Sequence, residues 1–299
     1  MKKLLLSAIA ASMLMGTGAV AKEQAAKDAT VGEVNKIAIS NAKEDARNNQ
    51  AKLVMEAIES LKFAQTAVIA LEHNDAKAAT ESLEKALGKL EVIMAAKDAP
   101  KLLPINNVIR VQEFVGTAED VDKAVKAVKT LLDEGKVQEA RALIAPLASE
   151  IDITVVNLPL ASYPAALKLA ASYVHDGKLD KAKEVLYIAL STFTEVTEVV
   201  PIPLLESTDL IAAASRIAKE DKTRALKYLD AASDALDVAE KLGYVSESET
   251  TYKMLHEKIK EVQKEIKGKN RAEKLFESLA QKLKEFKSKI ISSKETESK

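Results

Sequence analysis

The sequence predicts a mainly α-helical fold of repeated helical hairpins, with about three short β segments and a C-terminal helical arm of coiled-coil type. From residue 33 onward, apolar residues recur mostly at i, i+3, i+4 and i+7, which places them on one face of a helix. Nine glycines and seven prolines provide few turns for a β-sandwich or a doubly wound sheet. With 30% charged and 47% hydrophobic residues, the chain is too apolar for disorder and too charged for a multi-span membrane protein.

The first 21 residues follow the three-part pattern of a bacterial secretory signal peptide. Two lysines precede an apolar run over residues 4–15, and Ala19 and Ala21 occupy the small-x-small positions of a cleavage site. The run is shorter than the roughly 20 residues that a membrane-spanning helix needs. We therefore expect cleavage before Lys22, no stable membrane anchor, and a periplasmic protein.

The remaining chain divides into a helical repeat domain, residues 22–245, and a C-terminal helical hairpin or arm, residues 246–299. Without the signal peptide, the chain carries 42 basic and 45 acidic residues. This balance predicts no general attraction to nucleic acid or to anionic membranes.

Three segments rich in β-branched residues are expected to form short strands: residues 105–115, 151–158 and 192–202. A helix, a tight polar hinge and a second helix follow each segment. The hinges contain Gly135, Gly177 and Glu220-Asp221. An alanine follows each hinge, and successive alanines are 42 and then 43 residues apart.

A fourth hinge, residues 73–75, has no clear strand before it. Glycine at a hinge supplies the left-handed backbone that ends a helix, and Asn tolerates the same conformation. The Glu220-Asp221 hinge, which has neither residue, must turn differently or under strain.

Two narrow apolar stripes follow residue 246, and Lys and Glu flank both, as in a helical hairpin or a coiled-coil arm. The stripes contain Leu255, Ile259, Val262 and Ile266, and then Leu275, Leu279, Leu283, Phe286 and Ile290. The pattern leaves open whether they pack on their own chain or on a neighbouring one.

Motifs of catalysis and metal binding are missing from the sequence. There is no cysteine, no Gly-x-Ser-x-Gly elbow, no phosphate-binding glycine-rich loop and no His-Glu-x-x-His. His73, His175 and His256 do not share the spacing of a metal site, so we expect them to cap helices or lie on the surface. We predict no catalytic residue, no metal ligand and no cofactor.

Polar residues at the ends of two predicted strands are the candidate ligand residues: Thr154, Asn157, Tyr163, Glu195 and Thr197. Hydroxyls, an amide and a carboxylate lining a concave site could hold a small ligand. The competing interpretation is that they satisfy backbone groups of turns and strands, which is the ordinary role of Thr and Asn there.

The stretches 150–164, 176–183 and 199–205 resemble the YfdX family of bacterial secreted proteins, and the resemblance covers roughly residues 33–243. It implies a helix-rich, periplasmic and oligomeric protein associated with envelope stress such as acid or drug exposure. It implies no established enzymatic activity and therefore no catalytic residues.

The leading hypothesis is a non-enzymatic periplasmic stress protein that self-associates and binds misfolded protein clients or small amphiphilic molecules. The alternative is a specific small-ligand-binding module that uses the polar strand-end residues. A cell-wall enzyme that needs only two carboxylates is a third, weaker possibility.

Overall fold

The computed structural model describes residues 29–48, 54–96, 99–245, 250–269 and 271–297. The predicted signal peptide with Ala19 and Ala21 lies outside these residues, and so does the start of the predicted arm at residue 246. The described chain is mainly helical, with eleven helices and one small antiparallel sheet of three strands, as predicted.

The chain forms two compact units. Unit 1 contains residues up to 50, 109–153 and 198–299, and unit 2 contains residues 51–108 and 154–197. Each of the three strands contributes residues to both units.

The sheet has the order β1-β2-β3, with β1 at Leu102–Gln112, β2 at Glu150–Pro159 and β3 at Thr194–Pro201. The amide of Leu160 donates to the carbonyl of Lys101, and the amide of Ile202 donates to the carbonyl of Ser149. These bonds fix the registers on the two sides of β2.

The first strand begins and ends three residues earlier than the sequence predicted, whereas the other two lie within about two residues of their expected bounds. Pro104 falls inside β1. Because β1 is an edge strand, a residue without an N–H is tolerated there.

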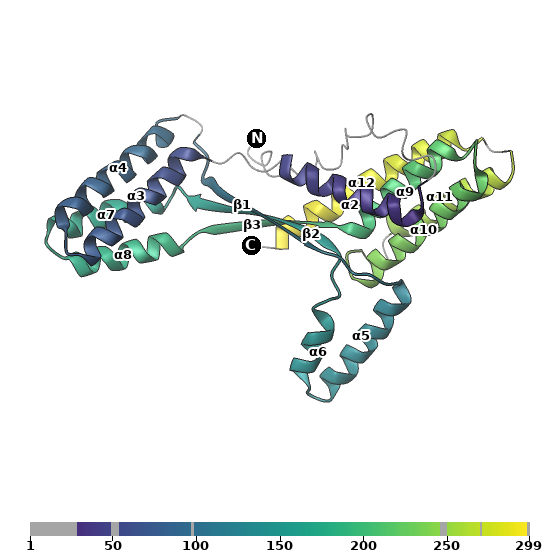
Figure 1. Cartoon of the computed structure of the whole chain (residues 1–299), viewed down its shortest axis with the longest axis horizontal. Helices are drawn as coiled ribbons and strands as arrows, with labels where there is room; N and C mark the ends of the chain where they lie inside the picture. Colours follow the sequence, from purple (N-terminus) through teal and green to yellow (C-terminus); the bar gives the residue numbers. More distant parts are fainter. Residues whose placement is uncertain (1–28, 49–53, 97–98, 246–249, 270, 298–299) are drawn as a thin grey trace. The chain divides into compact units, whose positions relative to one another are not determined.

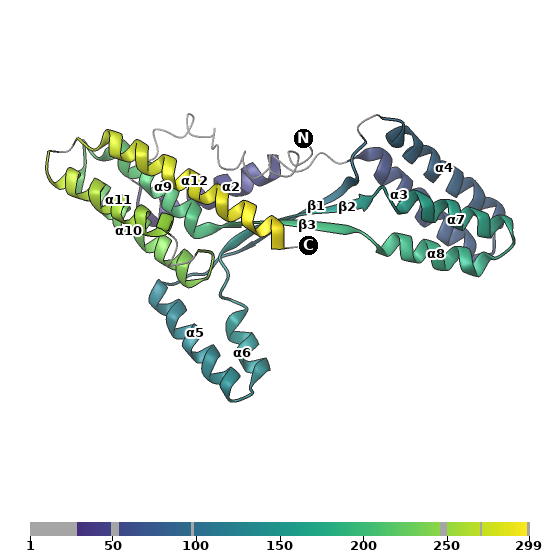
Figure 2. The same cartoon turned by 180° about the vertical axis from the view of Figure 1, so that it is seen from behind.

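Unit 2 is built from two helical hairpins that lie side by side (Figures 1 and 2). The first pairs α3, Met55–Glu72, with α4, Ala76–Met94. The second pairs α7, Tyr163–His175, with α8, Leu179–Ser191. α3 packs against α8 and α4 against α7, and their apolar faces form one buried cluster.

Unit 1 contains α2, Val31–Asn48, and the helices α9, Ile202–Ile217, and α10, Lys222–Lys241. α2 packs mainly against α9, and three of its buried residues share a cluster with β2 and β3. The hairpin of α5, Ala118–Asp133, and α6, Val137–Ile144, also belongs to this unit, and its α5 packs against α10.

The hinges have the predicted backbone. Asn74, Gly135 and Gly177 have φ angles of 58°, 73° and 74°, in the left-handed region. The hinge between α9 and α10 turns without a left-handed residue, and the Asp221 side chain accepts a hydrogen bond from the Arg224 amide at the start of α10.

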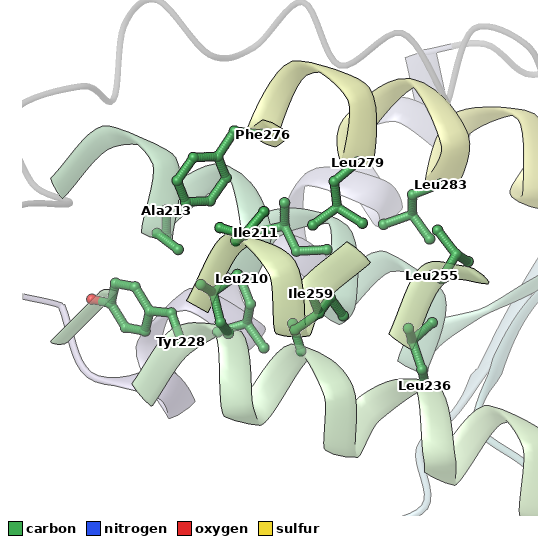
Figure 3. Close-up of a cluster of buried hydrophobic side chains, with 14 of the residues drawn as sticks. Leu210, Ile211, Ala213, Tyr228, Leu236, Leu255, Ile259, Phe276, Leu279 and Leu283 are labelled. Carbon is green, nitrogen blue, oxygen red and sulfur yellow. The ribbon is translucent and has the colours of Figure 1, made fainter. Parts of the chain in front are cut away.

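The last two helices are α11, Thr250–Lys267, and α12, Glu273–Glu297. From Leu255 to Phe286, the residues of the predicted stripes pack on their own chain: α11 lies against α10 and α12 against α9. Figure 3 shows Leu255 and Ile259 of α11 and Leu279 and Leu283 of α12 in one cluster with side chains of α9 and α10. Among the described helices, none combines the length and apolarity needed to cross a membrane.

Candidate functional site

A groove of about 420 Å³ lies along the α7–α8 hairpin of unit 2. Small alanines at three of its positions leave the space that larger side chains would fill. Its lining residues are Pro159, Ser162, Tyr163, Ala165, Ala166, Leu169, Val185, Ile188, Ala189 and Thr192. The lining is therefore almost entirely aliphatic, with hydroxyl groups confined to the strand-proximal ends of the two helices.

The groove is open on its outer side. Leu169 is 45% exposed and Ile188 is 59% exposed, although both are large aliphatic residues. Ser162 precedes the first residue of α7, and Thr192 follows the last residue of α8. The Thr192 hydroxyl donates to the carbonyl of Ile188 at 2.7 Å, which leaves its oxygen free to accept a hydrogen bond.

Tyr163 lines the groove with its ring, while its hydroxyl points into the protein. Its side chain is buried, and neither its hydroxyl nor that of Ser60 on α3 makes a hydrogen bond of good geometry. Burial raises the pKa of Tyr163, and a weak interaction with Ser60 offsets only part of this effect. The phenol stays neutral at every physiological pH and provides an apolar wall rather than an acid or a base.

The structure brings three of the predicted site residues together in the sheet. The hydroxyls of Thr154 and Thr197 share a hydrogen bond of 2.8 Å between β2 and β3. Asn157 is buried, and its Nδ2 donates to the carbonyl oxygens of Val155 at 3.0 Å and Thr194 at 3.2 Å. These contacts provide hydrogen-bond partners within the sheet for both hydroxyls and for the amide nitrogen of Asn157. The fourth strand residue, Glu195, is exposed.

A polar cluster between α10 and α11 was missed by the sequence analysis. His256 Nδ1 lies 2.9 Å from Ser233 Oγ, and its Nε2 lies 3.4 Å from Asp237 Oδ1, which also accepts a hydrogen bond from the Tyr252 hydroxyl. The Tyr252 and His256 rings meet edge to face. The expectation of a surface or capping role for His256 is therefore wrong, because its side chain is only 17% exposed.

The position of Ser233 does not fit nucleophilic catalysis, although its contacts with His256 and Asp237 run in the order Ser–His–Asp. Ser233 lies in the middle of α10, where the backbone amides are engaged in the helix and cannot form an oxyanion hole. Burial lowers the pKa of His256, with Asp237 opposing and Lys260 reinforcing the shift. The pairs Ser233 and Asp237, and Tyr252 and His256, are each four residues apart, and this spacing is the signal that could have revealed the cluster.

Glu206 on α9, also in unit 1, has a strongly perturbed carboxyl group. Burial and the neighbouring charge of Glu113 raise the pKa of Glu206 to about 7. In the described part of the chain, no three His, Asp or Glu side chains come together as a metal site would require.

Comparison with known proteins assigns the middle of the chain to a family. Residues 57–199 match the family model described as YfdX protein. A solved structure described as Salmonella Typhi YfdX is similar over 50% of this chain and 93% of its own, with 18% identity and a TM-score of 0.35. No curated protein matches the sequence. The match over residues 57–199, which covers nearly all of the two hairpins of unit 2 and most of the sheet, shows that this part of the chain is a YfdX family region.

Proposed function

We propose that the protein is a non-enzymatic, stress-associated binding protein of the bacterial periplasm, which binds small amphiphilic molecules in the α7–α8 groove and self-associates. One observation carries the binding part of the proposal. The groove is lined by aliphatic side chains along its length and has the Ser162 and Thr192 hydroxyls at one end. This arrangement complements a molecule with an apolar body and one hydrogen-bonding end.

The size of the groove suits such a ligand. A volume of about 420 Å³ lies within the range of roughly 300–1,000 Å³ that is common for small-molecule sites. Removing about 300 Å² of apolar ligand surface from water contributes about 7.5 kcal/mol at 25 cal/mol per Å². Association costs at least about 4 kcal/mol of lost freedom. The open groove therefore favours weak, reversible binding of many related molecules over tight binding of one.

The periplasmic location is supported by the signal-peptide pattern over residues 1–21, which includes the cleavage positions Ala19 and Ala21.

A binding role without catalysis agrees with the hydrogen bonding of the polar side chains in the sheet. Thr154, Thr197 and Asn157 bond to each other or to backbone carbonyls and present no reactive pair.

The test uses 1-anilinonaphthalene-8-sulfonate, a fluorescent amphiphile, and decanoate as a competitor. Ile188→Glu places a charge on the groove wall, and Ala166→Phe fills the space. The matched control is Ile69→Glu on α3, because Ile69 is 55% exposed but does not line the groove. We expect both groove variants to weaken probe binding at least tenfold and the control to bind as the wild type does. Equal binding by all four proteins would exclude the groove.

A second candidate function is the binding of unfolded protein segments, favoured by the exposure of Leu169 and Ile188, which both line the open groove. Aliphatic side chains of a client could occupy the same surface. In that case the protein slows the aggregation of a test client at acid pH, and Ile188→Glu loses this effect. No protection at a several-fold molar excess of protein would remove the chaperone form of the proposal.

A further inference from the structure

Two helix pairs of unit 1 run antiparallel and end together. The Gln263 side chain of α11 donates a hydrogen bond of 2.6 Å to Asp230 of α10, and the Tyr252 hydroxyl of α11 donates one of 2.8 Å to Asp237 of α10. Higher residue numbers on α11 therefore face lower numbers on α10. The start of α10 lies beside the end of α11.

The hinge between α9 and α10 and the hinge between α11 and α12 meet in one surface, which we call the tip. Lys219, in the first hinge, forms an ion pair of 2.5 Å with Glu273, the first residue of α12. The tip consists of residues 216–224, 264–269 and 271–274, all of them in unit 1.

Positive charge gathers at the tip. It carries nine basic and four acidic residues, which leaves 35 basic and 41 acidic residues on the rest of the chain. The adjoining turns of the same four helices carry three residues of each sign, over residues 210–215, 225–230, 258–263 and 275–280. The near balance of charge over the whole chain therefore conceals a local excess of five positive charges.

Most cations of the tip lack a carboxylate partner. Two of its four acidic residues are used within it, because Glu273 pairs with Lys219, and Asp221 pairs with Arg224 at 3.2 Å. The cations that form no ion pair with any described residue are all exposed: Arg216, Lys222, Lys264, Lys267, Lys269, Arg271 and Lys274. These seven groups are available to an anion from outside the chain.

The tip offers little besides charge. Tyr228 and Phe276, which are close to it in sequence, are buried in the core of unit 1 (Figure 3). Single-stranded nucleic acids are held by bases that stack on exposed aromatic rings, and the described residues of the tip present none. None of the exposed large hydrophobic side chains of the described chain lies in the tip either. A partner must therefore be recognised by its negative charge, at its surface.

We propose that the tip is a docking surface for the anionic headgroups of a phospholipid membrane. Clustered lysines and arginines are attracted to the negative surface of a bilayer that contains anionic lipids. The signal-peptide pattern over residues 1–21 predicts delivery to a compartment that membranes enclose. The proposal goes beyond amphiphile binding, whose groove lies in unit 2, and shares with the proposed function only the periplasmic location.

The charges also set the expected strength of the contact. Each basic residue beside an anionic bilayer strengthens binding about fivefold. This attraction falls off over a Debye length of about 8 Å at physiological ionic strength. Because no apolar side chain of the described tip is placed to enter the bilayer, we expect reversible binding that high salt abolishes.

The test is co-sedimentation of the full chain, purified from a bacterial periplasm, with phospholipid vesicles at low and at high salt. The vesicles contain either phosphatidylcholine alone or an equal mixture of phosphatidylcholine and phosphatidylglycerol. The tip variant combines Lys222→Gln, Lys267→Gln and Lys274→Gln, on α10, α11 and α12. All three side chains are exposed and form no ion pair with a described residue, so the fold should be unchanged by circular dichroism.

The matched control removes the same number of charges from unit 2. It combines Lys62→Gln, Lys77→Gln and Lys85→Gln on α3 and α4, where the three lysines are likewise exposed and form no ion pair with a described residue. Wild type and control should bind the mixed vesicles equally at low salt and should not bind phosphatidylcholine vesicles. The tip variant should bind the mixed vesicles at least about tenfold more weakly.

Three results would overturn the proposal. The first is a wild type that does not bind the mixed vesicles, and the second is equal weakening in the tip variant and the control. The third is release of the wild type from the vesicles by inorganic phosphate at constant ionic strength, which would indicate a site for a free anion. If the wild type binds duplex DNA and no vesicles, the tip recognises nucleic acid instead.

Probe binding in the α7–α8 groove, measured without vesicles, separates this inference from the proposed function. The tip variant should bind 1-anilinonaphthalene-8-sulfonate as the wild type does, and Ala166→Phe should bind the mixed vesicles normally. Loss of vesicle binding with intact probe binding concerns the tip alone, and the reverse concerns the groove alone.

Discussion

Replacing Asn157 by Leu decides whether the polar strand-end residues hold the sheet together or hold a ligand. Asn157 is buried on β2, and its amide nitrogen donates to two backbone carbonyls, one of them on β3. Leu has a similar volume and no donor. If the residue is part of the scaffold, the substitution costs stability and leaves groove binding unchanged.

The magnitude follows from the two hydrogen bonds. Each contributes about 0.5–1.5 kcal/mol net, and a buried carbonyl left without a donor adds a desolvation cost of about 1–3 kcal/mol. The greater burial of apolar surface by Leu offsets part of this loss. We expect Asn157→Leu to lower the free energy of unfolding by about 2 kcal/mol.

The assay is urea unfolding followed by circular dichroism, with probe binding measured on the same samples. The control is Thr154→Val with Thr197→Val, which replaces both partners of one hydrogen bond by groups of the same shape and should cost less than about 1 kcal/mol. A variant of Asn157 with unchanged stability and lost binding would refute the scaffold interpretation and identify a ligand residue.

Three further variants test the fold and its response to pH. Gly177→Ala should lower stability by about 1 kcal/mol in urea unfolding, because alanine is strained at a φ of 74° although the space around it is open; no loss would contradict the hinge geometry. Phe286→Ala should cost about 3–5 kcal/mol, since its side chain is fully buried, and a cost below about 1 kcal/mol would mean that α12 does not belong to the core of unit 1. The raised pKa of Glu206, about 7, means that the folded protein loses stability as pH rises from the unfolded pKa of about 4.5 to about 7. Glu206→Gln should therefore match the wild type in thermal unfolding at pH 4 and be more stable at pH 8, by at most about 3 kcal/mol; equal melting temperatures at pH 8 would contradict the assigned burial.

The hairpins and their hinges were predictable because they depend on local rules. Gly135 and Gly177 were expected to be left-handed, since a helix that reverses direction needs such a residue at its end, and both are. The strands were predictable from β-branched residues. The predicted strand began at residue 105, after Pro104, whereas β1 begins at Leu102, because an edge strand accepts proline within it.

The candidate site was less accessible to sequence reasoning because it depends on which helices pack together. Ala165 and Ala166 look like ordinary helix-packing residues, and only the packing of α7 on α8 turns them into the floor of a groove. Similarly, Ser233 and His256 are 23 residues apart on different helices. Their contact requires the pairing of α10 with α11, which the apolar stripes alone left open.

The topology of the sheet explains why the α5–α6 hairpin contacts the rest of unit 1 mainly through α5. Neighbouring strands are antiparallel, so the hairpins before, between and after the strands belong alternately to the two units: α3–α4 and α7–α8 to unit 2, α5–α6 and α9–α10 to unit 1. The two hairpins of unit 2 bury each other's apolar faces. In unit 1, α11–α12 occupies that place on α9–α10, so α5–α6 keeps an apolar face that no described hairpin of its own chain covers. Exposure of this face costs free energy, because removal of apolar surface from water is the main driving force of folding and of protein association.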